Sequence, residues 1–129
     1  TIPCAPATPE NAMPNFLLML HETPADSIAL SAAKLQEIYA AHRAWAERLA
    51  AAGQLVGGER LTDDGGRHLR RQGEKVLVSD GPYAEAHDLV GGFYLVQAPD
   101  LAAAEALAAE CPHLSGRQWI EIRTVEALG

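Results

Sequence analysis

The sequence predicts a single α+β domain. Its 129 residues fit one domain of ordinary size. Two segments show helical periodicity, and short apolar runs bounded by glycine or proline lie before, between and after them, as is typical of strands. Residues 1–13 contain three prolines and no apolar run. We therefore expect a disordered N-terminal tail over 1–13 and the folded domain over 14–129.

The domain is expected to begin with a strand followed by a long helix. Asn15–His21 (NFLLMLH) is almost wholly apolar, which predicts a strand buried on both faces. Ser31–Ala52 is rich in alanine and repeats apolar side chains at helical spacing. Ser31 is a favourable N-cap and Gly53 a natural helix end, so both ends of this helix are predicted.

The middle of the chain predicts three strand segments. Gln54–Leu61 (QLVGGERL) is the first, and its Gly57-Gly58 pair predicts a bulge or a close approach of two backbones. A turn follows at TDDGG. Arg67–Arg71 and Glu74–Ser79 are then expected to pair as one hairpin, with the basic residues on a solvated edge.

A loop, a strand, a helix and a final strand complete the domain. Asp80–Val90 is expected to be a loop with one helical turn, after which Gly91-Gly92 opens the strand Phe93–Ala98. The predicted helix Leu101–Cys111 follows Pro99-Asp100 and ends at a proline. Trp119–Val125 (WIEIRTV) is the last predicted strand.

This order reduces to βαββαβ, which is the frame of a ferredoxin-like sandwich. Two helices cover only one face of such a sheet, while apolar residues occur on both sides of the predicted strands. We therefore expect a homodimer in which two sheets pack face to face.

The composition limits the kinds of partner and the cellular location that we expect for this chain. The net charge of −7 argues against nucleic-acid binding, since that affinity rests on neutralising phosphates. No apolar run is long enough to cross a membrane, and the first residues lack the features of a signal peptide. The two cysteines, Cys4 and Cys111, are too few and too far apart for a disulfide framework, so a reducing cytoplasm is the expected location.

Four separated motifs occur in one order along the chain, and each lies in or beside a predicted strand. They are LVGGERL (Leu55–Leu61), VLVSDGPYAE (Val76–Glu85), LVGGFY (Leu89–Tyr94) and EIR (Glu121–Arg123). Together they resemble the DGPF branch of the YCII-related family, and the resemblance covers residues 14–125. It implies a ferredoxin-like fold and a dimeric α/β barrel, in agreement with the predicted frame.

The resemblance implies little about activity, because most members are uncharacterised. The broader family has a proposed histidine–aspartate pair in a cleft. The matching helix places His42 at the histidine position, but Cys111 stands at the aspartate position, before Pro112. The proposed pair is therefore incomplete. In the motif that gives the DGPF branch its name, Tyr83 replaces the usual phenylalanine. His87 stands where lysine is common.

His42 and Asp80 are the candidate catalytic residues. His42 lies in the apolar stripe of its helix, and a half-buried imidazole suits general acid–base work. The alternative is a core histidine bonded to a backbone carbonyl. Asp80 can replace the missing aspartate opposite His42, or it can simply fix the turn before Gly81-Pro82.

Five further residues are candidates for binding a substrate, and all lie in or next to the motifs. They are Glu59, Arg60, Tyr83, Glu85 and His87. For Glu59 and Arg60 the alternative is an exposed ion pair. Glu85, His87 and Asp88 are poorly spaced for a metal, so no metal or other cofactor is expected. A metal held by His42, His87 and nearby carboxylates is the weaker alternative.

Two functions follow from these residues. The first is a small cofactor-free enzyme that uses His42 as acid or base on a small organic molecule. The second is a non-catalytic module that binds a ligand or a protein in a stress pathway. The second rests on the resemblance, because some DGPF members are encoded beside extracytoplasmic-function sigma factors.

Overall fold

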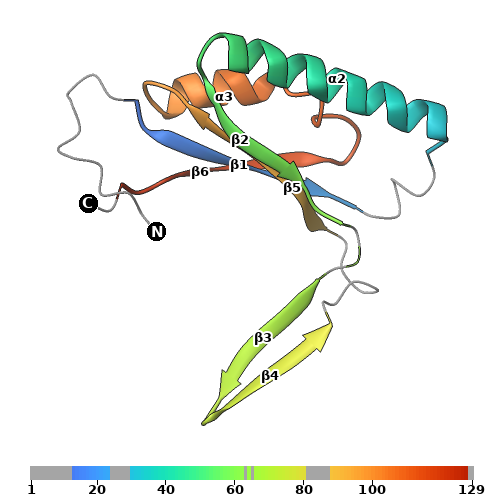
Figure 1. Cartoon of the computed structure of the whole chain (residues 1–129), viewed down its shortest axis with the longest axis vertical. Coiled ribbons are helices and arrows are strands. Elements are labelled where there is room, and N and C mark those ends of the chain that lie inside the picture. The colour runs from blue at the N-terminus through green and yellow to red at the C-terminus, as the bar shows by residue number, and fades with distance from the viewer. Residues whose placement is uncertain (1–12, 24–29, 63, 65, 81–87, 128–129) are drawn as a thin grey trace.

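The computed structural model describes residues 13–23, 30–62, 64, 66–80 and 88–127, which form a four-stranded sheet, a two-stranded hairpin and two helices (Figure 1). The main sheet is antiparallel, with the order β2-β5-β1-β6. With the helices, these four strands give the predicted ferredoxin-like frame. Their bounds are β1 Asn15–Glu22, β2 Leu55–Arg60, β5 Leu89–Gln97 and β6 Trp119–Thr124. Except for Met13, the predicted tail lies outside the described residues.

Both helices lie on one face of the main sheet (Figure 1). Helix α2 spans Ala32–Ala51, and the Ser31 hydroxyl at its N-cap accepts a hydrogen bond from the Lys34 backbone N–H at 3.0 Å. Gly53 follows it with φ of +73°, a value that favours glycine. Helix α3 spans Leu101–Ala109 and is capped in the same way by Asp100. The predicted helices and their caps are confirmed.

The hairpin of β3 (Arg67–Gln72) and β4 (Lys75–Asp80) projects away from the main sheet (Figure 1). Its register runs from Arg67 opposite Asp80 to Gln72 opposite Lys75. Gly73 makes the turn with φ of +63°. The predicted hairpin and its solvated basic strand are confirmed, since all but one of its strand residues are exposed.

The core lies between the helices and the main sheet. Residues along β1 alternate between half-buried and buried, and the buried ones point toward the helices. A single chain therefore buries one face of β1 rather than both. We call the other side of the main sheet the open face. The core cluster is made of Phe16, Leu18, Trp45, Leu49, Val96, Ala98, Ala104, Ala108 and Cys111.

Two glycine pairs let β2 approach β5 closely. A side chain at Gly92 would place its Cβ 2.9 Å from the Glu59 carbonyl oxygen, and one at Gly58 would place it 2.8 Å from the Phe93 carbonyl oxygen. The bulge predicted at Gly57-Gly58 is confirmed by a register shift between Leu55 and Gly57. The predicted start of the next strand at Phe93 is wrong, because β5 begins at Leu89 and continues through its glycines.

Candidate functional site

A cavity of about 270 Å³ lies between α2 and the helix-facing side of the main sheet. The first half of α2 forms one wall, and its Leu35 and Ile38 are only half-buried because they face this space. Strands β1, β2 and β5 form the other wall, and the turn after α3 contributes one end. The polar residues that line the cavity include Glu22, Tyr39, His42, Arg60, Tyr94 and His113.

His42 is bonded to Tyr94 at the cavity wall. The His42 Nδ1 lies 2.8 Å from the Tyr94 hydroxyl oxygen. Trp45, which is 1% exposed, packs edge-on against the Tyr94 ring at 4.9 Å between ring centres and so fixes the tyrosine. The alternative of a core histidine bonded to a backbone carbonyl does not describe His42, whose hydrogen-bond partner is a phenol that also lines the cavity.

Burial sets the protonation state of this pair. Desolvation, followed by the nearby charges of His113 and Arg60, lowers the pKa of His42 below its usual 6.5. Burial also raises the pKa of Tyr94 to about 12. At neutral pH the imidazole is therefore uncharged and the phenol keeps its proton, so one group of the pair donates the hydrogen bond and the other accepts it.

Glu22 is a buried carboxylate beside the cavity. It is 3% exposed, and its Oε1 lies 3.8 Å from Nη1 of Arg60. The Arg60 guanidinium also lies over the Tyr39 ring, 5.5 Å from its centre. A Cβ at Gly91 would overlap the Glu22 carboxylate, so glycine at this position makes room for the buried charge. The cavity thus contains a fixed cation and a fixed anion.

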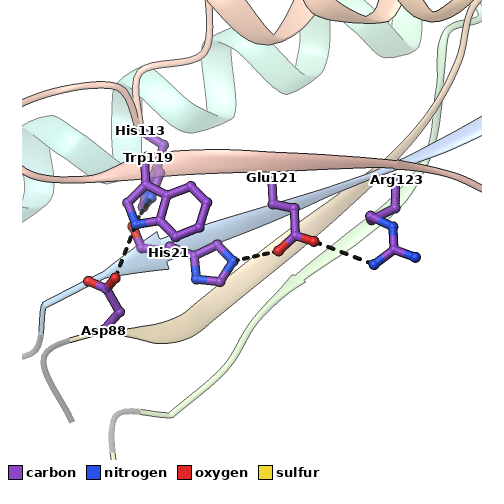
Figure 2. A network of polar contacts seen from close by, with 6 residues as sticks. All are labelled: His21, Asp88, His113, Trp119, Glu121 and Arg123. Atoms are coloured by element: carbon purple, nitrogen blue, oxygen red, sulfur yellow. Dashed lines mark hydrogen bonds and ion pairs between the residues drawn. The ribbon is translucent and has the colours of Figure 1, made fainter.

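His113 closes one end of the cavity. It is 5% exposed, and its Nε2 donates a hydrogen bond to the His21 carbonyl at 2.8 Å. Its ring centre lies 6.3 Å from that of His42, and burial is the largest cause that lowers the pKa of His113. This bond leads to a network on the open face, which Figure 2 shows. There the His21 ring stacks on Trp119 at 3.9 Å, and its Nε2 lies 3.1 Å from Glu121 Oε1.

Asp80 does not lie beside His42 in the described structure. It is the last residue of β4, on the projecting hairpin, and does not line the cavity. Its carboxylate is 86% exposed and lies 3.2 Å from Nε of Arg67. This ion pair joins the start of β3 to the end of β4, so in the described structure Asp80 has a structural contact.

Glu59 and Arg60 both border the cavity, but their side chains lie on opposite sides of β2. Arg60 pairs with Gly92 and faces the helices, whereas Glu59 pairs with Phe93 and belongs to the open face. The expectation that one of them points inward is confirmed for Arg60.

Tyr83, Glu85 and His87 lie outside the described residues. No group of three or more His, Cys, Asp or Glu within the described part of the chain could hold a metal ion. Cys111 is 3% exposed in the core, and burial raises the pKa of its thiol. This matches a small core hydrophobe rather than a nucleophile.

The lining residues that were not predicted from the sequence include Glu22, Tyr94 and His113. The alternation Phe16, Leu18, Leu20, Glu22 places the carboxylate on the buried side of β1, and this pattern is readable in the sequence. The other two carry no local signal. Tyr94 lies on a strand that pairs on both sides, and His113 lies in a turn whose position depends on how α3 packs.

The family follows from comparison with known domains. The family model of the YCII-related domain matches residues 15–127, which is nearly the whole chain. The chain belongs to the YCII-related family. No curated protein matches the sequence. Within the described residues, no helix of this YCII-related domain is long and apolar enough to cross a membrane.

Proposed function

We propose that this YCII-related domain is a small cofactor-free enzyme in which His42 acts as acid or base on a small organic molecule. The hydrogen bond of 2.8 Å between His42 and Tyr94 at the cavity wall carries this proposal. A neutral imidazole that is held by a second proton-bearing group and faces a cavity has the parts that general acid–base catalysis needs.

The pair can pass a proton in either direction. When His42 Nδ1–H donates to the Tyr94 oxygen, Nε2 has a free lone pair and can accept a proton from a substrate. When the Tyr94 hydroxyl donates to Nδ1, Nε2–H can give a proton. A reaction that removes a proton at one carbon and returns it at another, or that adds or eliminates water, would use both states.

The cavity limits the substrate. Pockets for drug-sized ligands hold about 300–1,000 Å³, and this one holds about 270 Å³, so we expect a small molecule with few polar groups. Arg60 at the rim would hold an anionic or carbonyl oxygen, and the apolar side chains of α2 would cover the rest. Glu22 keeps Arg60 in place.

The test is a ligand screen followed by turnover. Purified protein is screened by thermal shift against small carboxylic acids, lactones and enolisable ketones, and each hit is followed by NMR for conversion. We expect conversion by the wild type, its loss in His42→Gln with binding retained, and a reduced rate in Tyr94→Phe. Unchanged conversion in His42→Gln would exclude the assigned role.

The second candidate is a non-catalytic binding module in a sigma-factor-linked stress pathway. It is favoured by one observation: Asp80, the proposed catalytic partner, lies on the hairpin rather than at the cavity. Tight binding without conversion of any hit, and equal affinity in His42→Gln, would support the module over the enzyme.

We also propose a cytoplasmic homodimer of the DGPF branch. The half-buried apolar side chains on the open face support the dimer, because a second copy would cover them. The motif around Asp80-Gly81-Pro82 supports the branch. The two widely separated cysteines, one of them a buried free thiol, support a reducing compartment.

A further inference from the structure

We propose that the β3–β4 hairpin is an arm that docks on the open face of a second copy of this chain. This inference does not rest on the catalytic proposal, and it goes beyond a dimer of two packed sheets because it assigns the contact to a specific element. The arm is defined here as residues 67–80.

The arm exposes too much apolar surface to stand alone. Leu69, Val76, Leu77 and Val78 are 63%, 47%, 47% and 54% exposed. An isolated two-stranded hairpin is at best marginally stable in water, and apolar patches of this kind mark contact sites. Within the described residues the arm pairs only with itself, as a separate two-stranded sheet.

The register divides the arm into two faces. Leu69 lies opposite Val78, and Arg71 lies opposite Val76, so these four side chains share one face. Arg70 and Leu77 lie on the other face with Lys75. The first face also carries the ion pair of Arg67 and Asp80. It therefore joins three apolar side chains to Arg71 and this pair, and we infer that it makes the contact.

The open face of the main sheet complements this surface. Leu17, Met19, Phe93 and Leu95 share it by register and are half-buried. Two carboxylates lie in the same row of the sheet. Glu121 pairs with Met19, and Glu59 pairs with Phe93. The arm face thus offers an apolar surface with a net charge of +1 from Arg67, Arg71 and Asp80. The open face offers an apolar surface with Glu59 at one edge and, at the other, Glu121, which contacts Arg123 and His21.

Charge and size point to a second copy as the partner. Residues 67–80 carry a net charge of +2, so the rest of the chain carries −9, and a basic arm is attracted to another copy. Six residues in each strand give a length of about 20 Å, which spans a four-stranded sheet about 15 Å across. In a two-fold dimer each arm would lie on the other copy.

The test is the dissociation constant of the dimer, measured by sedimentation velocity over a concentration series of the whole chain. The arm variant is Leu69→Ser with Val78→Ser, and the matched control is Leu114→Ser, which removes a leucine that is 45% exposed outside both surfaces. We expect a wild-type dimer and a dissociation constant raised about tenfold or more in the arm variant alone. Arg71→Glu, which leaves the apolar residues in place, should weaken the dimer as well.

Mixing separates arm-to-face docking from arm-to-arm docking. The arm variant is combined with Met19→Ser, whose arm is intact but whose open face is altered, after circular dichroism has shown that both are folded. One intact contact remains in the mixed dimer, so we expect more dimer in the mixture than in either variant alone. A monomeric wild type, an arm variant that dimerises like the wild type, or a mixture without restored dimer would each overturn the proposal.

Discussion

The main sheet and the β3–β4 hairpin are both antiparallel and both regular in register, yet they differ in what covers them. The main sheet carries two helices on one face, and Phe16 and Leu18 beneath them are 2% and 0% exposed. Leu69 on the hairpin is 63% exposed. Backbone pairing alone therefore explains the shape of the hairpin, whereas side-chain burial explains the stability of the sheet.

The same difference separates the two candidate catalytic residues. His42 lies against the covered face, where burial lowers its pKa and Tyr94 fixes its ring. Asp80 lies on the uncovered hairpin, where its carboxylate is 86% exposed. Desolvation is the largest cause of the lowered pKa of His42, and the covered side of the main sheet supplies it.

The largest expected effect is the loss of a core side chain on the covered side. Trp45→Ala removes a side chain that is 1% exposed, so we expect the free energy of unfolding to fall by about 3–5 kcal/mol. Urea unfolding followed by circular dichroism measures it. A loss below about 1 kcal/mol would contradict the burial of Trp45.

The next effect concerns the fit of Glu22 against β5. Gly91→Ala would force a Cβ into the Glu22 carboxylate, and we expect a loss of about 1–3 kcal/mol in unfolding free energy. The loss should be smaller when the substitution is made in a Glu22→Ala background, which frees the space. Equal losses in both backgrounds would show that the two positions are not coupled.

A third effect is the pH dependence of stability. Burial lowers the folded-state pKa of both His42 and His113 below 6.5, so the unfolded chain binds more protons than the folded one in that window. The stability contribution is therefore complete above pH 6.5 and is lost as the pH falls through the lowered values. Each unit of pKa difference is worth about 1.4 kcal/mol.

Urea unfolding between pH 7.5 and 5.5 measures this slope. The charged and titratable groups near the pair include Glu22, Arg60, Tyr94 and His21, and these stay unchanged in the variant His42→Gln with His113→Gln. We expect the variant to have a flatter profile than the wild type, whatever its absolute stability. A parallel profile would assign the slope to other groups.

The smallest effect is expected on the uncovered hairpin. Leu69→Ala should change the unfolding free energy of the monomer by no more than about 0.5 kcal/mol, because the side chain has little to lose in a single chain. The measurement is made at a concentration where the chain is monomeric. A loss comparable to that of Trp45→Ala would show that the hairpin packs on its own chain.

Much of the fold could be predicted because its signals are local. Ser31, Gly53 and Asp100 lie at the helix ends that they predict, and the paired glycines lie where β2 and β5 meet. The predicted start of β5 is wrong, because glycine commonly interrupts a strand, whereas β5 continues through Gly91 and Gly92. The site was only half predicted: His42 and Arg60 face the cavity, whereas Tyr94 and His113 come from distant elements.

The order of the elements, their caps and the ferredoxin-like frame follow from local sequence signals, because capping, periodicity and turn chemistry depend on neighbours along the chain. The contact of His42 with Tyr94, 52 residues away, and the position of Asp80 on the hairpin depend on how the elements pack. Residue type reveals which chemistry is available. The packing of α2 on the sheet decides which groups lose water, and that loss sets their pKa values and their partners.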